Sequence, residues 1–143
     1  MEARRVRDIM IHEVTTLKRN DKLTLANDIM QLGRIRHLPV LDDEAKQLVG
    51  IVSQRDLFRG ALARALGYGD HAQRKVLDTL LVKEVMSTDV LTTTPDTPLV
   101  EAARVLMERK IGCLPVVEGG RLVGIVTEAD FVAMVARNLK SAS

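Results

Sequence analysis

Two short segments of the chain place a carboxylate three residues after a hydroxyl side chain. Ser53 and Asp56 follow the apolar run LVGIV at 48–52, and Thr127 and Asp130 follow an identical run at 122–126. A hydroxyl at a helix N-terminus can bond a phosphate, which the free amides and the positive end of the helix dipole also attract. A carboxylate beside it can accept both hydroxyls of a ribose. Because the same residue types simply cap a helix, the spacing leaves two interpretations open: a nucleotide contact and a helix cap.

These segments belong to a longer internal repeat. Residues 6–40 align with residues 82–116 at an offset of 76 with ten identities in 35 positions, and residues 48–57 align with 122–131 at an offset of 74 with six in ten. The offset changes between DDEAKQ in the first copy and EGGR in the second, where a surface turn tolerates a difference in length. We interpret the pattern as a duplication.

The elements that must position these segments recur in both copies as β-α-β-β-α, so the fold class is α/β. Apolar residues at three- and four-residue spacing predict the first helix of each copy, with Asp21 or Thr97 as its N-cap and Pro98 in the first turn. The second and third strands read as a hairpin, and the all-apolar LVGIV runs suit strands buried on both faces. The expected strands are 14–17, 37–41, 48–52, 90–93, 113–117 and 122–126, and the expected helices are 23–33, 57–66, 99–109 and 131–139.

The repeat predicts a first unit at residues 1–66, a helical linker at 67–81 and a second unit at 82–143. A unit of about 60 residues makes a thin core on its own. We therefore expect the two units to pack on each other through their sheets.

Composition argues against several classes of function. With two Phe, one Tyr, no Trp and a net charge of +2, the chain is poorly supplied for stacking on bases or for holding a nucleic acid. No apolar run approaches eighteen residues, the start MEARRVRDIM is too polar for a secretory signal, and a single cysteine fits a reducing compartment, so we expect a cytoplasmic protein. We find no catalytic grouping, glycine-rich phosphate loop or metal spacing, and expect no enzyme activity and no required cofactor.

The segments Ile-x-x-Leu-Pro-Val and Leu-Val-Gly-Ile-Val-(Ser/Thr)-x-x-Asp, present in both copies, resemble the CBS domain, named after cystathionine β-synthase. The resemblance covers about residues 4–139. It implies a tandem pair, or Bateman module, in which two units are related by a pseudo-two-fold axis. It also implies that an adenine nucleotide or adenosyl ligand (AMP, ADP, ATP, NAD or S-adenosylmethionine) binds in two clefts between the units, that the chain forms a homodimer, and that it regulates a partner protein, for example in energy sensing.

Carried over by position, the resemblance implies two sets of ligand-binding residues. Site one consists of Ala26, Ile35, Arg36, His37, Thr127 and Asp130, and site two of Thr97, Ala102, Ile111, Gly112, Ser53 and Asp56. The small alanine and the isoleucine would form a slot for adenine, and backbone groups near Ile35 and Ile111 would read its edge.

The two sets differ in charge. Site one has Arg36, an arginine suited to phosphate, where site two has Gly112. Asp21 stands in the first copy where the second has the hydroxyl of Thr97, and a carboxylate there would repel phosphate. The alternatives are a solvated Arg36 and a half-buried His37 that only packs. Cys113 is expected in the core.

The leading hypothesis is a stand-alone sensor that binds an adenine nucleotide and changes its self-association or its contact with a partner. A structural interaction module with empty clefts is the alternative, and nucleic-acid binding is the less favoured one. Apolar residues on the helices would supply the homodimer contact, unless they are internal core; they are Leu57, Phe58, Leu62, Leu66, Phe131 and Val135.

Overall fold

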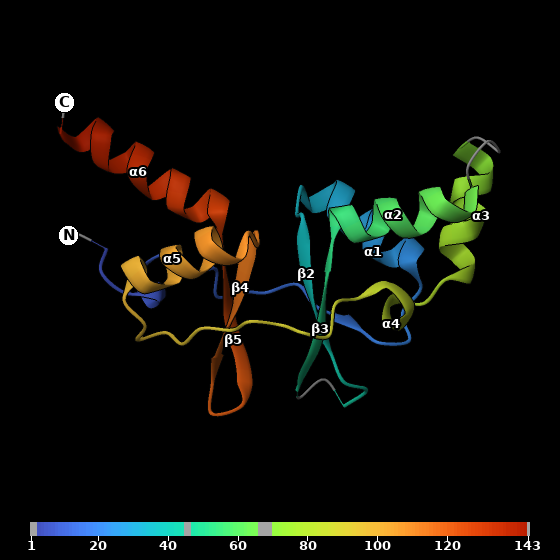
Figure 1. The fold of residues 1–143 in the computed structure, drawn as a ribbon, viewed down its shortest axis with the longest axis horizontal. Helices are drawn as coiled ribbons and strands as arrows, with labels where there is room; N and C mark the ends of the chain where they lie inside the picture. The colour runs from blue at the N-terminus through green and yellow to red at the C-terminus, as the bar shows by residue number, and fades with distance from the viewer. Residues whose placement is uncertain (1–2, 45–46, 66–69, 143) are drawn as a thin grey trace. The chain divides into compact units, whose positions relative to one another are not determined.

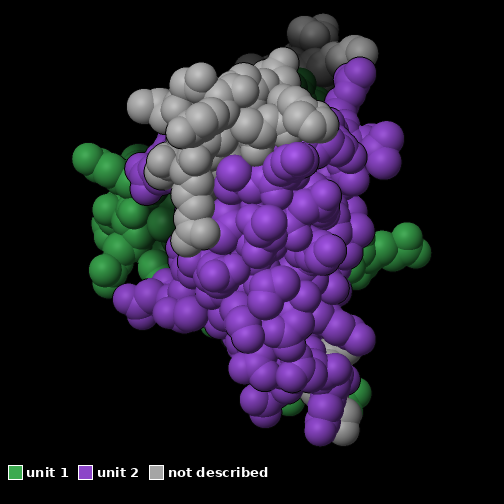
Figure 2. Space-filling model, turned by 90° about the vertical axis from the view of Figure 1, so that its right-hand side faces the viewer, with its two compact units in different colours: residues 1–14, 91–143 green, residues 15–90 purple. Residues whose placement is uncertain are grey.

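The computed structural model describes residues 3–44, 47–65 and 70–142, and Figure 1 shows its helices and strands. The chain forms two compact units, coloured separately in Figure 2: unit 1 comprises residues 1–14 and 91–143, and unit 2 comprises residues 15–90. The expected boundaries at residues 66 and 82 mark the copies in the sequence. The compact units, by contrast, exchange the segments with which the two copies begin.

Unit 2 contains a three-stranded sheet with helices against it. Strand β1 (Leu17–Lys18) runs parallel to β2 (His37–Leu41), which pairs antiparallel with β3 (Leu48–Ser53). Helix α1 (Leu23–Gly33) connects β1 to β2, and α2 (Gln54–Ala65) follows β3. Helices α3 (Asp70–Thr79) and α4 (Val82–Val85) complete the unit. The predicted order β-α-β-β-α is confirmed here, and α3 is the helix expected in the linker.

Unit 1 repeats this plan with a reduced first strand. It begins with the short helix η1 (Val6–Asp8), and α5 (Leu99–Arg109) leads into a hairpin of β4 (Cys113–Glu118) and β5 (Arg121–Thr127), followed by α6 (Glu128–Ala142). Instead of the predicted strand at 90–93, Thr93 alone bridges Val116 in parallel. This pair is equivalent, at the offset of 76, to Leu17 with Val40 in β1 and β2.

Several expected boundaries were wrong. The first strand begins at Leu17 rather than at residue 14, and the last helix of each copy begins three residues earlier than expected, at Gln54 and at Glu128. Helices α1 and α5 have Lys22 and Pro98 at their N-cap positions, with no side-chain capping bond. The expected burial of both strand faces is observed for residues 124–126 of β5. In β3, buried residues alternate with half-buried ones.

Asp21 and Thr97, expected as helix N-caps, instead close equivalent turns just before α1 and α5. The Asp21 carboxylate accepts the Lys18 amide at 2.7 Å, and the Thr97 hydroxyl accepts the Thr94 amide at 3.3 Å. The side chain in each case bonds an amide three residues before it, and neither helix start has a side-chain capping bond.

The segment that begins each copy adds to the hairpin of the other copy. The amides of Ile11 and Ile125 donate to each other's carbonyls at 2.8 and 3.0 Å in unit 1, and those of Ile51 and Ser87 do so at 2.9 Å each in unit 2. A glycine of the hairpin lies under each added segment: a Cβ on Gly124 would stand 2.9 Å from the Ile11 carbonyl oxygen. This exchange explains why residues 1–14 belong to unit 1.

Each unit has its own apolar core. In unit 2 it joins the sheet and α1 to α2, α3 and α4 through Leu23, Leu38, Val52, Leu57, Leu77, Leu80 and Val82. In unit 1 it comprises Val6, Leu99, Ala102, Leu106, Leu114, Val116 and Val126. Among the residues that the structure describes, no helix combines the length and apolar character that a membrane span requires.

Of the residues expected at a dimer contact, two are part of the cores. Leu57 is only 4% exposed, and Phe131 packs against the core of unit 1. Phe58 and Val135 are 64% and 51% exposed. The side chains of Leu62 and Leu66 lie outside the described part of the chain.

Candidate functional site

The hydroxyl-x-x-Asp segment of unit 2 forms the first turn of α2. The Ser53 amide donates to Asp56 Oδ2 at 2.8 Å, and the Asp56 amide donates to Ser53 Oγ at 3.1 Å. This reciprocal pair is a capping box, in which two side chains satisfy two of the backbone amides that a helix start leaves unpaired. The helix-cap interpretation is therefore confirmed for this segment.

The corresponding segment of unit 1 has the same geometry with one more bond. Asp130 Oδ2 accepts the Thr127 amide at 2.8 Å and the Thr127 hydroxyl at 3.0 Å, and the Asp130 amide lies 3.3 Å from Thr127 Oγ1. Both carboxylates use Oδ2 for these bonds. An ionised carboxylate offers about four acceptor positions, so the capping box leaves acceptor capacity on Asp56 and Asp130.

A second backbone segment lies beside each capping box. In unit 2 the Gln54 amide donates to the Arg36 carbonyl at 2.8 Å, and His37 pairs with Ser53 across the hairpin. In unit 1 the Glu128 amide donates to the Gly112 carbonyl at 3.0 Å, and Cys113 pairs with Thr127. Each unit thus brings the residues after its first helix next to its own hydroxyl-x-x-Asp segment.

The expected slot residues occupy equivalent places in the two units. Ala26 and Ala102 are buried in α1 and α5, and Ile35 and Ile111 are half-buried at the helix ends. The amides of Ile35 and Ile111 already donate to the carbonyls of Met30 and Leu106, at 3.1 and 3.2 Å. These two amides are therefore engaged in ending the helices, and other backbone groups would have to read an adenine edge.

Sequence reasoning did not identify the residues that end these helices. Arg34 and Lys110 adopt the left-handed conformation, both with φ of 54°, a role usually filled by glycine. The available signal was their positive charge, which suits a helix C-terminus. Because both helices end in the same way, the chain turns at the same point in each copy. The turn leads into β2, which begins at His37, or into β4, which begins at Cys113.

The predicted site sets draw on both units. Ala26, Ile35, Arg36 and His37 of site one belong to unit 2, and Thr127 and Asp130 to unit 1. Site two divides in the opposite sense. Within one unit the structure brings Arg36 next to Ser53 and Gly112 next to Thr127, and the assignment of Arg36 to one ligand with Asp130 stays a prediction.

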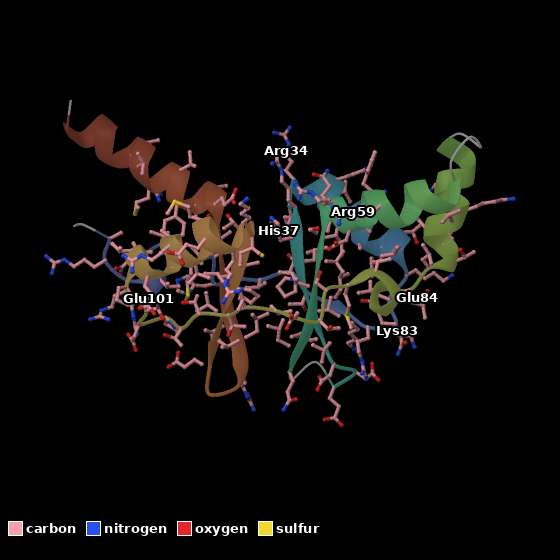
Figure 3. All side chains as sticks on the ribbon, viewed as in Figure 1. Arg34, His37, Arg59, Lys83, Glu84 and Glu101 are labelled. Atoms are coloured by element: carbon pink, nitrogen blue, oxygen red, sulfur yellow. The ribbon has the colours of Figure 1, made fainter. Side chains whose placement is uncertain are left out.

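The two units differ in charge beside the capping boxes. Arg36 is exposed and His37 is half-buried in unit 2, whereas Gly112 and Cys113 stand at these places in unit 1. Cys113 is 6% exposed, as expected of a core residue. Burial, with a smaller contribution from the charge of Glu128, raises the pKa of its thiol to about 12. In Figure 3, Arg34, His37 and Arg59 are labelled around the upper part of unit 2.

No metal centre is visible among the described residues, where no three His, Cys, Asp or Glu side chains group together. The candidate segments offer hydroxyl, carboxylate, guanidinium and backbone groups to a ligand. Such groups can hold a polar organic ligand by hydrogen bonds and charge.

Known proteins share both the sequence and the fold of this chain. The AcuB protein of Vibrio cholerae, whose name refers to acetoin utilization, is 37% identical with a TM-score of 0.80, over 98% of this chain and 95% of that one. The protein CBSX2, solved in complex with AMP, is 31% identical with a TM-score of 0.75, over 96% of this chain and 99% of that one. The CBS domain pair of protein MJ0100, solved with 5-methylthioadenosine and S-adenosyl-L-methionine, is 28% identical with a TM-score of 0.75, over 94% and 97%.

Curated relatives include longer proteins. An uncharacterized protein of Methanocaldococcus jannaschii is 31% identical over 91% of this chain, which spans 42% of that protein's length. The model of the CBS domain matches residues 6–63 and again residues 82–137. The two matches coincide with the two copies of the repeat, and the chain belongs to the CBS domain family, of which it carries a tandem pair.

Proposed function

We propose that this chain is a regulatory module that binds an adenosine-containing ligand and does no chemistry on it. The observation that carries the proposal is the acceptor capacity left on Asp56 and Asp130, each beside a hydroxyl at a helix N-terminus. The solved relatives in complex with AMP, or with 5-methylthioadenosine and S-adenosyl-L-methionine, support the choice of ligand class. All of these ligands contain an adenosyl group, whose ribose carries two adjacent hydroxyls.

In this proposal each carboxylate accepts the ribose hydroxyls through the acceptor positions that the capping box does not use. The hydroxyl of Ser53 or Thr127 faces the phosphate or other group attached to the ribose. Bonds of this kind, between an ionised acceptor and a neutral donor, are stronger than those between neutral groups. Sites one and two, as predicted from the resemblance, name the residues that would line the adenine.

The charge difference between the copies leads us to assign different ligands to them. The ligand next to Arg36 is a nucleotide with several phosphates, because an exposed guanidinium binds phosphate oxygens two at a time. The ligand next to Gly112 carries less negative charge, as AMP or an adenosyl compound does. We further propose that a homodimer and a regulated partner protein transmit the effect of binding.

The competing function is a structural interaction module. It is favoured by the capping boxes themselves, because the bonds of Ser53 with Asp56 and of Thr127 with Asp130 account for both segments without any ligand. A substitution that keeps the cap and removes the ligand contact distinguishes the two functions.

Asp56→Asn and Asp130→Asn are such substitutions. Asparagine keeps an oxygen that can accept the amide of Ser53 or Thr127, but it loses the charge and replaces the second oxygen by a donor. Titration calorimetry with AMP, ADP, ATP, NAD and S-adenosylmethionine should show at least one ligand bound by the wild type. Each variant should weaken one binding event about tenfold to a hundredfold, with an unfolding midpoint close to that of the wild type.

Ser53→Ala and Thr127→Ala are the matched controls for the cap. They remove a capping oxygen and keep the carboxylate, so they should lower stability more than affinity for adenosine itself. If the wild type binds none of the five ligands, or if both asparagine variants bind as it does, the interaction module is the better description.

A further inference from the structure

A group of arginines lies at the end of unit 2 where α2 begins. The Gln54 amide donates to the Arg36 carbonyl at 2.8 Å, so residues 34–37 lie beside residues 53–59. Each of these two segments carries two arginines. We call them the arginine patch, which consists of Arg34, Arg36, Arg55 and Arg59. Figure 3 labels Arg34 and Arg59 at this end of unit 2.

The positive charge of the arginine patch is not neutralised within the protein. All four residues are exposed, and none of their guanidiniums bonds to an acceptor within the described part of the chain. Arg55 and Arg59 stand four residues apart on α2, a spacing at which like charges destabilise a helix. The fold therefore gives no reason for this charge, whereas a bound anion would.

The equivalent end of unit 1 lacks the charge. The two segments of the patch hold four arginines and one carboxylate, and their counterparts, residues 110–113 and 127–133, hold one lysine and two carboxylates. Ala129 and Ala133 stand at the places of the two arginines of α2, and both are exposed. Because the same helix start forms without these arginines, their presence in unit 2 points to binding rather than to folding.

The two capping hydroxyls differ in the same sense. The Thr127 hydroxyl donates to Asp130 Oδ2 at 3.0 Å. The Ser53 hydroxyl accepts the Asp56 amide at 3.1 Å but donates to no acceptor among the residues that the structure describes. Its hydrogen is thus available to an anion. In unit 2 the cap and the arginine patch offer donors side by side, and in unit 1 neither does.

We propose that the arginine patch binds a chain of phosphate groups that runs from Ser53 along the first turns of α2 to Arg59. A guanidinium fork takes two oxygens and a terminal phosphate group offers three, so four forks are satisfied by a chain of about three phosphates and not by one. Where the chain is part of a nucleotide, the inference rests on the proposed function. An inorganic phosphate chain would bind the same patch without it.

Titration calorimetry with adenosine, AMP, ATP and inorganic tripolyphosphate tests the patch. The patch variant carries Arg55→Ala and Arg59→Ala. The control variant carries Arg104→Ala and Arg109→Ala, which remove the same charge from exposed places on α5 of unit 1. The patch variant should weaken ATP and tripolyphosphate about threefold to tenfold and leave adenosine and AMP unchanged. The control variant should bind all four as the wild type does, and added salt should reduce the loss in the patch variant.

The outcomes distinguish a failure of the patch from a failure of the proposed function. If adenosine and AMP bind but ATP and tripolyphosphate bind equally well to the wild type and the patch variant, the proposed function stands and the assignment of the patch is overturned. If tripolyphosphate binding depends on the patch while adenosine does not bind at all, the proposed function fails and the patch stands. If both variants weaken ATP equally, net charge accounts for the binding, and the assignment is again overturned.

Sedimentation tests another occupant of the patch, a second copy of the chain. We expect the wild type and the patch variant to have the same mass in solution, because the arginines serve a small anion. A mass that changes in the patch variant would show that Arg55 and Arg59 contact another copy, and the assignment to a phosphate chain would be wrong.

Discussion

Replacing Gly124 by alanine should destabilise unit 1 by separating residues 10–12 from the hairpin. A Cβ at this position would stand 2.9 Å from the Ile11 carbonyl oxygen and 2.9 Å from the Met10 sulfur. The methionine side chain can rotate away. The Ile11 carbonyl cannot do so freely, because it accepts the Ile125 amide at 3.0 Å while the Ile11 amide donates back at 2.8 Å.

The size of the effect follows from these contacts. Overpacking in a close-packed region costs about 1–3 kcal/mol. If the strain is relieved by moving the segment, the two Ile11–Ile125 hydrogen bonds are lost instead, at about 0.5–1.5 kcal/mol each. Both routes lead to a loss of about 2 kcal/mol in the free energy of unfolding, or about thirtyfold in the ratio of folded to unfolded protein.

Urea denaturation measures this loss, and hydrogen exchange of the Ile11 and Ile125 amides locates it. Gly33→Ala is the matched control: its Cβ would meet only the flexible end of Ile35, at 3.0 Å, and alanine favours the helix. It should leave stability unchanged or slightly raised. Gly124→Ala in a Met10→Ala background should still be destabilised, because the carbonyl contact remains. A loss below about 0.5 kcal/mol, the range of ordinary surface substitutions, would refute the reasoning.

Three further outcomes are expected. Arg36→Ala should weaken ATP more than adenosine in calorimetry, and added salt should reduce the difference; equal losses for both ligands would contradict a phosphate contact. The amides of Arg5 and Arg4 donate to Asp8 and hold the pKa of its carboxyl below the ordinary 3.8. The stability that Asp8 supplies is therefore present above its unfolded pKa and lost as pH falls through the lower folded value, so Asp8→Asn should reduce the slope of an acid titration of stability there. Because burial raises the pKa of Cys113 to about 12, its thiol should react with a disulfide reagent at pH 8 only as fast as unit 1 opens, and rapid reaction in the native protein would contradict its burial.

Local patterns were sufficient to predict most elements of this fold. The spacing of Leu23, Ala26 and Met30 predicted α1, and the strand pairs around the turns predicted both hairpins. Helix starts were predicted less well. Ser53 and Thr127 were expected as possible caps with Asp56 and Asp130 in the first turn, as the bonds show, but the helix bounds were set at residues 57 and 131 instead of 54 and 128. Local chemistry identified the right residues there and placed the boundary three residues late.

The exchange of segments between the units could not be predicted from the repeat. Residues 6–14 and 82–90 are equivalent in the two copies, and nothing in their sequence distinguishes the hairpin of their own copy from that of the other. The pairing joins residues far apart in the chain, such as Ile11 with Ile125, and a local sequence pattern does not specify which distant partner is chosen. The capping boxes, in contrast, join residues three positions apart and could be predicted from the sequence. That Arg36 lies next to Ser53 became evident only from the folded hairpin.

The duplication allows one copy to serve as the reference for the other. Features found in both units, such as the capping boxes and the left-handed Arg34 and Lys110, follow from what the common fold requires at those places. Where the units differ, the common fold does not require either residue. The presence of a charged or an apolar side chain at such a position then needs another explanation. Arg36 against Gly112 is such a difference beside the proposed ligand. Since the fold tolerates either residue, substitution of Arg36 should change binding with little effect on stability, which makes this position the most direct test of the proposed ligand contact.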